Sequence, residues 1–390
     1  MQRNHPTLKE STTGTLGPVP CPVRRQQLVD VWKYPLVMGV TGFHFKSLCN
    51  FTVNPCMGCG HGCPFCYVPE VSASKQKAGL AEHGVTDANG QWGEYVLLRR
   101  WDEEAFRKSL QECTKTPASK LQPGGHRAVM MSSTTDPYQH LRHPDTARAR
   151  ELNACRAAMV RRALEIIRDE SDLKVRVQTR FTAAEADLEL LASFGPRLLL
   201  GTSVITLDPG IGKLYEPHVP DSARRLAMLA KARSAGVNVY VALAPVPPEV
   251  DEGGLRETLT AIAAVEPCTV FCESLNVRGG NIDRIQKRAA ELGVQTQLDL
   301  FGDPGKAAAY SLRTLQSVER IAAEVGLANQ LHLWPDKGTL GGRAAFAVVD
   351  DPARHTAWLF KWWNRISEWP ETLPARVITS VESEVHHDRR

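Results

Sequence analysis

The sequence contains no run of eighteen or more apolar residues, so we expect no transmembrane helix and no membrane partner. The first 25 residues, MQRNHPTLKESTTGTLGPVPCPVRR, are polar and lack the apolar core of a secretory signal. We therefore expect a cytoplasmic protein with reduced cysteines. In that compartment, cysteines bind metals or act in catalysis more often than they form disulfides.

The sequence also lacks a large excess of either positive or negative charge. The 47 Lys and Arg against 43 Asp and Glu give a formal net charge of only +4 at pH 7. This slight excess permits a phosphate-bearing substrate, but it does not by itself predict nucleic-acid binding. With 390 residues, 43% hydrophobic and 23% charged, the chain is typical of a globular protein with one large domain or two ordinary ones.

Strand-like runs alternate with helical patterns from Arg127 onward. The runs are continuous and rich in Val and Leu, as in parallel strands that are buried on both faces. They cover residues 127–134, 174–179, 197–205, 237–246, 269–277 and 329–334, and an earlier run ends at residue 53. Ten or more residues of helical pattern separate successive runs, which is the βαβ signature. The pattern predicts a parallel α/β barrel, full or partial.

We expect extensions on both sides of this barrel. Residues 1–45 should form an irregular arm, because the first 35 or so carry Pro, Thr and Gly without periodicity. Residues 46–340 should form the barrel, and residues 341–390 a Trp-rich helical segment with a polar tail. The stretch ARHTAWLFKWWNRISEWP (353–370) could pack over the barrel or act as a substrate lid.

Four of the ten cysteines lie within eleven residues, in NPCMGCGHGCPFCYVPE (54–70). Their spacing is Cys56-x2-Cys59-x3-Cys63-x2-Cys66. A structural zinc site usually has a dozen or more residues between its two Cys-x2-Cys pairs, and bacterial ferredoxins have a different order of gaps. Both fit poorly. A non-catalytic zinc or electron-transfer module stays open as an alternative, in which Cys56 would be a fourth ligand.

Cys59, Cys63 and Cys66 alone form C-x3-C-x2-C, with Phe65 directly before the last cysteine, and this resembles the radical S-adenosylmethionine superfamily. The resemblance implies that the three thiolates bind three irons of one 4Fe–4S cluster and leave the fourth iron open. S-adenosylmethionine would bind that iron, with Phe65 beside the cofactors. One electron from an external reductant, such as flavodoxin or ferredoxin, would then cleave it. The resulting 5′-deoxyadenosyl radical would abstract hydrogen from an organic substrate.

Further segments are similar to the spore-photoproduct-lyase-like branch of this superfamily. They include the cysteine loop itself, SSTTDPYQ (132–139) and ESLNVRGGN (273–281). The resemblance covers roughly residues 50–285 and implies a partial parallel (β/α)6 barrel with the cofactors at its carboxyl-terminal mouth. Cofactor-binding candidates follow at three strand ends, although hydroxyl residues at such ends could instead cap helices. The candidates are Ser133, Thr134, Thr135 and Asp136, then Gln178 and Thr179, then Ser203.

One residue departs from that branch. Spore photoproduct lyase has a hydrogen-donating cysteine in the segment that corresponds to SSTTDP, and Ser133 stands at that position here. An O–H bond is much stronger than an S–H bond, so serine is a poor hydrogen-atom donor. We therefore expect lyase or transferase-type radical chemistry other than that reaction. Nucleic-acid or nucleotide lesion repair stays as the alternative.

Candidates for substrate chemistry lie in the run at 269–277. Cys272 could place a thiol near the substrate and Glu273 could bind a polar group, whereas a buried structural cysteine and a salt-bridged rim are the plain alternatives. The substrate could be a small molecule, a peptide or a nucleotide. No cysteine follows Cys272, so we expect a single cluster.

Overall fold

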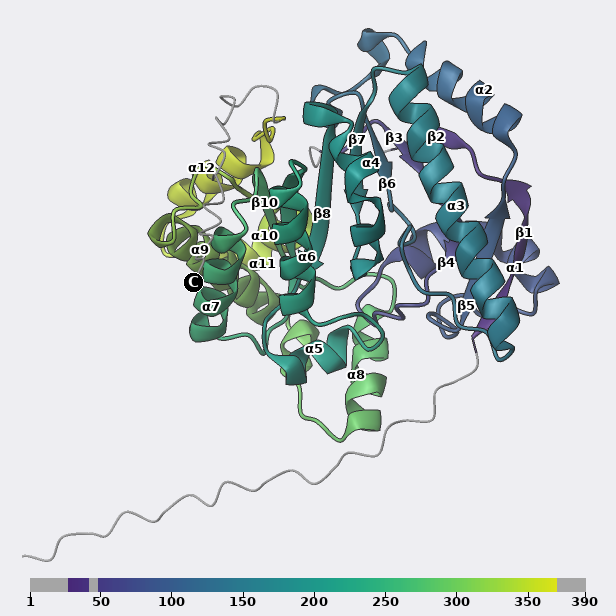
Figure 1. Cartoon of the computed structure of the whole chain (residues 1–390). Coiled ribbons are helices and arrows are strands. Elements are labelled where there is room, and N and C mark those ends of the chain that lie inside the picture. The colour runs from purple at the N-terminus through teal and green to yellow at the C-terminus, as the bar shows by residue number, and fades with distance from the viewer. Residues whose placement is uncertain (1–26, 42–47, 370–390) are drawn as a thin grey trace, which may run out of the picture.

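A computed structural model of the chain describes residues 27–41 and 48–369. The largest element is an eight-stranded sheet with the order β11-β10-β9-β8-β7-β6-β3-β2. Figure 1 labels these strands except β9 and β11. Its strands are β2 (Met38–Val40), β3 (Phe51–Val53), β6 (Ala128–Met131), β7 (Lys174–Gln178), β8 (Leu198–Val204), β9 (Asn238–Val246), β10 (Thr269–Ser274) and β11 (Leu331–Leu333). Neighbouring strands from β3 to β11 pair in parallel, and β2 pairs antiparallel with β3. Within the described strands β11 and β2 are open edges, which confirms the predicted partial parallel barrel.

The strands are buried on both faces, as their apolar sequences predict. All seven residues of β8 and all four of β6 are buried. Alternate side chains point into the barrel lumen or toward the covering helices, because successive side chains of a strand face opposite ways. Val270 and Cys272, for example, join the core on the helix side, whereas Phe271 joins Tyr240 and Met130 in a separate cluster.

The helices are α1 (Lys77–Glu82), α2 (Glu103–Thr114), α3 (Thr146–Glu170), α4 (Leu188–Ala192), α5 (Pro209–Tyr215), α6 (Ser222–Ser234), α7 (Glu252–Ala264), α8 (Asn281–Leu292), α9 (Pro304–Glu324), α10 (Lys337–Leu340), α11 (Arg343–Phe346) and α12 (Pro352–Trp363). Helices α3, α6, α7 and α9 supply much of the core on one face of the sheet. Each begins at an aspartate whose carboxylate accepts hydrogen bonds from backbone N–H groups of the first turn. No helix in the described ranges is both long and apolar enough to span a bilayer.

A second sheet lies beside the barrel, with the order β1-β5-β4. It contains β1 (Leu28–Pro35), β5 (Tyr95–Arg100) and β4 (Cys56–Gly58). The expectation of an irregular arm over 1–45 is therefore wrong for 28–35 and 38–40, which form β1 and β2. Trp32 is 1% exposed, so β1 depends on tertiary contacts that local periodicity does not reveal. Residues 1–26 and 42–45 lie outside the described residues, and the boundaries at 46 and 340 stay predictions.

The Trp-rich segment contacts the amino-terminal end of the barrel. Trp369 is 1% exposed, and its indole N–H donates to the backbone oxygen of Pro196, just before β8, at 2.7 Å. The ammonium of Lys174, at the start of β7, lies 5.4 Å from the centre of its ring. This agrees with packing over the barrel, and the residues after Trp369 lie outside the described part of the chain.

Candidate active site

A pocket opens at the carboxyl ends of the parallel strands. The predicted residues that line it are Cys59, Cys63, Phe65, Cys66, Ser133, Thr134, Thr135, Asp136, Gln178, Thr179, Ser203 and Glu273. Parallel strands end at the same edge of a sheet, and the residues that follow them therefore meet there. Of the predicted site residues, Cys272 alone is not among the lining residues.

Cys59, Cys63 and Cys66 enter the pocket from one loop. All three carry free thiols. Burial raises the pKa of Cys59 to about 12, and burial together with the thiols of Cys59 and Cys66 raises the pKa of Cys63. No three Cys, His, Asp or Glu side chains in the described ranges converge closely enough to hold a single metal ion. A 4Fe–4S cluster needs a wider arrangement, because each thiolate binds its own iron.

Glycines set the path of this loop. Gly58 has φ +85°, and a Cβ there would lie 2.4 Å from the backbone oxygen of Tyr95. Gly62 has φ +59°, and a Cβ there would lie 3.2 Å from the Cα of Gly93. Only glycine combines positive φ with so close a backbone approach, so the loop conformation depends on these two positions.

Helix α8 holds the cysteine loop from outside. The Arg284 side chain donates from Nε to the backbone oxygen of Pro64 at 3.0 Å and also to the backbone oxygen of Cys66. Asn281, at the start of α8, donates to the backbone oxygen of Phe65 at 3.5 Å. The loop carrying the cysteines is therefore fixed by a helix more than 200 residues away in the chain.

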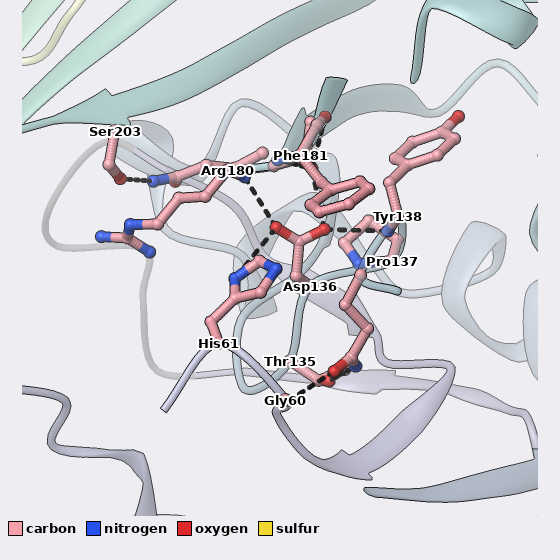
Figure 2. A network of polar contacts seen from close by, with 12 residues as sticks. Gly60, His61, Thr135, Asp136, Pro137, Tyr138, Arg180, Phe181 and Ser203 are labelled. Carbon is pink, nitrogen blue, oxygen red and sulfur yellow. Dashed lines mark hydrogen bonds and ion pairs between the residues drawn. The ribbon is translucent and has the colours of Figure 1, made fainter. Parts of the chain in front are cut away.

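Asp136 joins three parts of the site (Figure 2). One carboxylate oxygen accepts from the Thr179 hydroxyl and from the backbone N–H of Tyr138, both at 2.8 Å. The other accepts from the backbone N–H of Arg180 at 2.6 Å and lies 3.7 Å from Nδ1 of His61. Asp136 is 6% exposed. Through these contacts Asp136 connects the segment after β6 to the end of β7 and to the cysteine loop.

The other hydroxyl residues after β6 are joined to the cysteine segment. Asn54 donates to the Ser133 hydroxyl at 2.9 Å and accepts the backbone N–H of Thr134 at 2.9 Å. The Thr135 hydroxyl donates to the backbone oxygen of Gly58 at 2.7 Å. Asn54 was not among the predicted site residues, although it opens the cysteine motif.

Gln178 and Ser203 meet across neighbouring strands. The Gln178 amide donates to the Ser203 hydroxyl at 2.6 Å, and its carbonyl oxygen accepts from Tyr240 at 3.3 Å. Both residues line the pocket next to Thr179. The structure thus brings the predicted residues of β7 and β8 together.

A buried ion cluster that no local sequence pattern predicted lies beside the cysteines. Arg180 donates from Nε to Glu216 at 2.9 Å, and Arg225 donates to the same carboxylate at 3.1 Å. Burial acts to raise the pKa of Glu216, but the two guanidinium groups hold that pKa below its ordinary value. Two cations share one anion, which leaves a net charge of +1 in this trio. The Arg180 guanidinium lies over the Phe65 ring, 5.5 Å from its centre.

Glu273 and Cys272 point in different directions. Glu273 lines the pocket and accepts from the Asn276 amide at 3.0 Å. Cys272 is fully buried in the core on the helix side of the sheet, and burial raises the pKa of its thiol. The expectation that the Cys272 thiol reaches the substrate is therefore contradicted. Strand alternation turns adjacent residues to opposite faces, and an entirely buried run does not reveal which face is the lumen.

Several buried polar atoms of residues that line the pocket lack hydrogen-bond partners in the described part of the chain. They include Nε2 of His61, Oγ of Ser132 and Nε1 of Trp92. Ser132 also has φ +121°, a backbone region that non-glycine residues rarely adopt and that is often found at functional sites. Buried polar atoms are normally paired, so these atoms fit a pocket that a bound molecule completes.

Sequence comparison identifies one family model and similar proteins from a virus and from mycobacteria. The family model described as "Radical SAM superfamily" matches residues 53–262. An uncharacterized protein of the Acidianus two-tailed virus is 30% identical over 242 residues, which cover 61% of this chain and 71% of the viral protein. An uncharacterized protein of Mycobacterium tuberculosis is 25% identical over 235 residues, which cover 59% of this chain and 60% of that protein. The match therefore spans less than two thirds of the mycobacterial protein.

Solved structures of spore photoproduct lyase have a similar fold. The lyase complexed with dinucleoside spore photoproduct matches with a TM-score of 0.53 and 14% identity, over 78% of this chain and 80% of that chain. A lyase variant with bound AdoMet and the same dinucleoside matches equally well. The family model covers more than half of the chain, so this protein belongs to the radical SAM superfamily, whose enzymes use a 4Fe–4S cluster and S-adenosylmethionine, and is itself an enzyme.

Proposed function

We propose that the protein cleaves S-adenosylmethionine reductively and uses the 5′-deoxyadenosyl radical to abstract hydrogen from an organic substrate. Cys59, Cys63 and Cys66 would bind the cluster. The observation that supports this most is the meeting of these three thiols with polar strand-end residues in one pocket. When bound, the cluster supplies the electron that cleaves the cosubstrate, and an external flavodoxin or ferredoxin would supply that electron to the cluster.

The remaining pocket residues suit the cosubstrate. The hydroxyl and amide groups of Ser203 and Gln178 form a polar patch that matches ribose hydroxyls. Arg180 contributes positive charge beside the cysteine loop, which matches a carboxylate. Ser133, Thr134, Thr135, Asp136 and Thr179 line the same side, and Phe65 offers an aromatic face.

The alternative of a non-catalytic metal module needs Cys56 as a fourth ligand. Cys56 lies on β4, is 1% exposed and packs in the hydrophobic core with Val96 and Leu98. It is not among the residues that line the pocket. This position favours three cysteine ligands over four.

We do not propose the spore photoproduct lyase reaction. Ser133 stands where that family has its donor cysteine, and its hydroxyl is bonded to the Asn54 amide. The product radical would need a hydrogen atom from another source. The fold shared with the lyase keeps nucleotide or nucleic-acid lesion repair as a second candidate.

Anaerobic reconstitution tests the proposal. Protein supplied with iron and sulfide should show 4Fe–4S absorption, and dithionite with S-adenosylmethionine should release 5′-deoxyadenosine. Cys63→Ala should lose the cluster, whereas Cys56→Ala should keep it. Iron binding without cosubstrate cleavage would contradict the radical function, and equal losses in both variants would favour the four-ligand module.

A further inference from the structure

We propose, resting on the function above, that the indole N–H of Trp92 donates a hydrogen bond to a sulfur of the 4Fe–4S cluster and raises its reduction potential. Trp92 lines the pocket and is 9% exposed. Its Nε1 is buried and has no hydrogen-bond partner among the described residues. An indole N–H only donates, so the bound molecule that completes this contact must present an acceptor. Cysteine thiolates and cluster sulfides are such acceptors.

The backbone beside Trp92 lies directly against the cysteine loop. Gly93 has φ +92°, and a Cβ there would lie 2.6 Å from the Cα of Gly62. A Cβ at Gly62 would in turn lie 3.9 Å from the backbone oxygen of Trp92. The indole belongs to the hydrophobic cluster against which Cys59 and Cys66 pack. Trp92 therefore lies on the cysteine side of the pocket.

The loop that carries Trp92 is held by side chains. The carboxylate of Asp87 accepts from the backbone N–H groups of Asn89 and Gly90, at 3.1 and 3.0 Å. Arg284, which binds backbone oxygens of the cysteine loop, also donates to the side-chain oxygen of Asn89. Helix α8 thus holds both loops together. Because the protein itself fixes this loop, the indole needs little further ordering when a cofactor binds.

The cosubstrate is a second source of acceptors for this N–H, but the arrangement favours the cluster. The groups that suit the cosubstrate, Gln178 and Ser203, lie at the ends of β7 and β8 of the barrel. Trp92 instead precedes β5 of the second sheet, and β5 pairs with β4, which leads into the cysteine loop. A donor at this place meets the cluster before the cosubstrate.

A hydrogen bond to a cluster sulfur favours reduction. The cluster gains one electron from the external reductant, and the proton stays on the indole nitrogen throughout. The added negative charge strengthens the hydrogen bond, so the donor stabilises the reduced form more than the oxidised form. Loss of the N–H should lower the equilibrium constant for reduction about tenfold, which corresponds to about 59 mV for one electron.

Isotope labelling tests the contact on the unmodified protein. Protein that contains tryptophan labelled with nitrogen-15 in the indole would be reconstituted anaerobically and reduced with dithionite, without S-adenosylmethionine. Pulsed electron paramagnetic resonance should detect a nitrogen-15 coupling, because a nitrogen that donates to a cluster sulfur acquires part of the unpaired spin density. No such coupling would overturn the proposal.

Two variants assign the coupling. Trp92→Phe should lose it, because phenylalanine keeps an aromatic ring and removes the donor. Trp363→Phe should keep it, since the Trp363 indole donates to the backbone oxygen of Pro335 at 2.8 Å and does not line the pocket. A coupling that persists in Trp92→Phe would contradict the assignment to this residue.

Redox titration of the same proteins measures the consequence. The midpoint potential of Trp92→Phe should be about 59 mV lower than that of the unmodified protein, and that of Trp363→Phe should be unchanged. Equal midpoints in Trp92→Phe and the unmodified protein would contradict a role in reduction. Equal midpoints together with weaker binding of S-adenosylmethionine would overturn the proposal and assign the N–H to the cosubstrate.

The two proposals fail in different ways. Reconstituted protein without 4Fe–4S absorption would contradict both. A reducible cluster without release of 5′-deoxyadenosine would contradict the radical function alone. Normal cosubstrate cleavage without a nitrogen-15 coupling would contradict the Trp92 hydrogen bond alone.

Discussion

Arg180 and Glu216 are joined at the carboxyl end of the barrel, with Nε of the arginine 2.9 Å from Oε1 of the glutamate. Arg225 donates to the same carboxylate and also to the backbone oxygen of Ser203, at 2.5 Å. The trio therefore ties the end of β7 to the end of β8. Its surplus positive charge faces the side of the pocket that carries the cysteines.

We predict that Arg180→Gln lowers the midpoint potential of the reconstituted cluster. Reduction adds negative charge to the cluster, and a nearby cation stabilises the reduced form. Without Arg180, Glu216 and Arg225 form a neutral pair, so the potential should fall by roughly 60 mV, the one-electron equivalent of a tenfold change. Redox titration followed by electron paramagnetic resonance measures it. Arg224→Gln is the control, because this side chain is 76% exposed. Equal potentials in both variants would show that Arg180 does not act on the cluster.

Gly58→Ala should destabilise the protein far more than Gly84→Ala. Both glycines have φ near +80°, but a Cβ at Gly84 meets nothing within 4 Å, whereas one at Gly58 lies 2.4 Å from a backbone oxygen. Alanine at positive φ should lower the free energy of unfolding by about 1–2 kcal/mol in each variant. The close contact at Gly58 should raise its cost to about 4 kcal/mol or more. Urea unfolding gives both values, and similar losses would mean that the loop relaxes around the new methyl group.

Trp369→Ala should destabilise the barrel by about 3–5 kcal/mol, because it removes a large, fully buried side chain. The indole also lies 5.1 Å from the Arg176 guanidinium in the lumen. Thermal unfolding with Phe360→Ala as the control checks this, since Phe360 is 54% exposed on α12. Cosubstrate cleavage per folded molecule should stay unchanged, because Trp369 lies at the opposite end of the barrel. Lost cleavage in a stable variant would favour a role at the active site.

His332→Phe should reduce the acid sensitivity of the fold. Burial lowers the pKa of His332 to about 3, well below the ordinary histidine pKa of about 6.5. Below pH 6.5 the unfolded chain gains a proton at this residue that the folded chain does not, so stability falls as the pH falls. His332 should lower the free energy of unfolding by about 1–2 kcal/mol between pH 6.5 and pH 5. Urea unfolding at pH 6.5 and at pH 5 measures this decrease, which should be about 1–2 kcal/mol smaller in the variant than in the unmodified protein. An equal decrease in both proteins would show that other groups cause the acid sensitivity.

Local sequence determined the parts of the site whose residues are close together in the chain. The three cysteines lie within eight residues, so one loop necessarily brings them together. The candidates from Ser133 to Asp136, Gln178 and Thr179, and Ser203 follow parallel strands, and the common direction of those strands delivers them to one edge. Continuous apolar runs were enough to predict that direction.

Tertiary structure decided the features that depend on which face of an element is used or on distant partners. β10 is buried on both sides, so its sequence does not distinguish Glu273 in the pocket from Cys272 in the core. Arg180, Glu216 and Arg225 become one ion cluster only when three separate segments pack together. Trp369 reaches the far end of the barrel for the same reason. Burial energy depends on contacts between distant segments, whereas spacing and periodicity report only on neighbours along the chain.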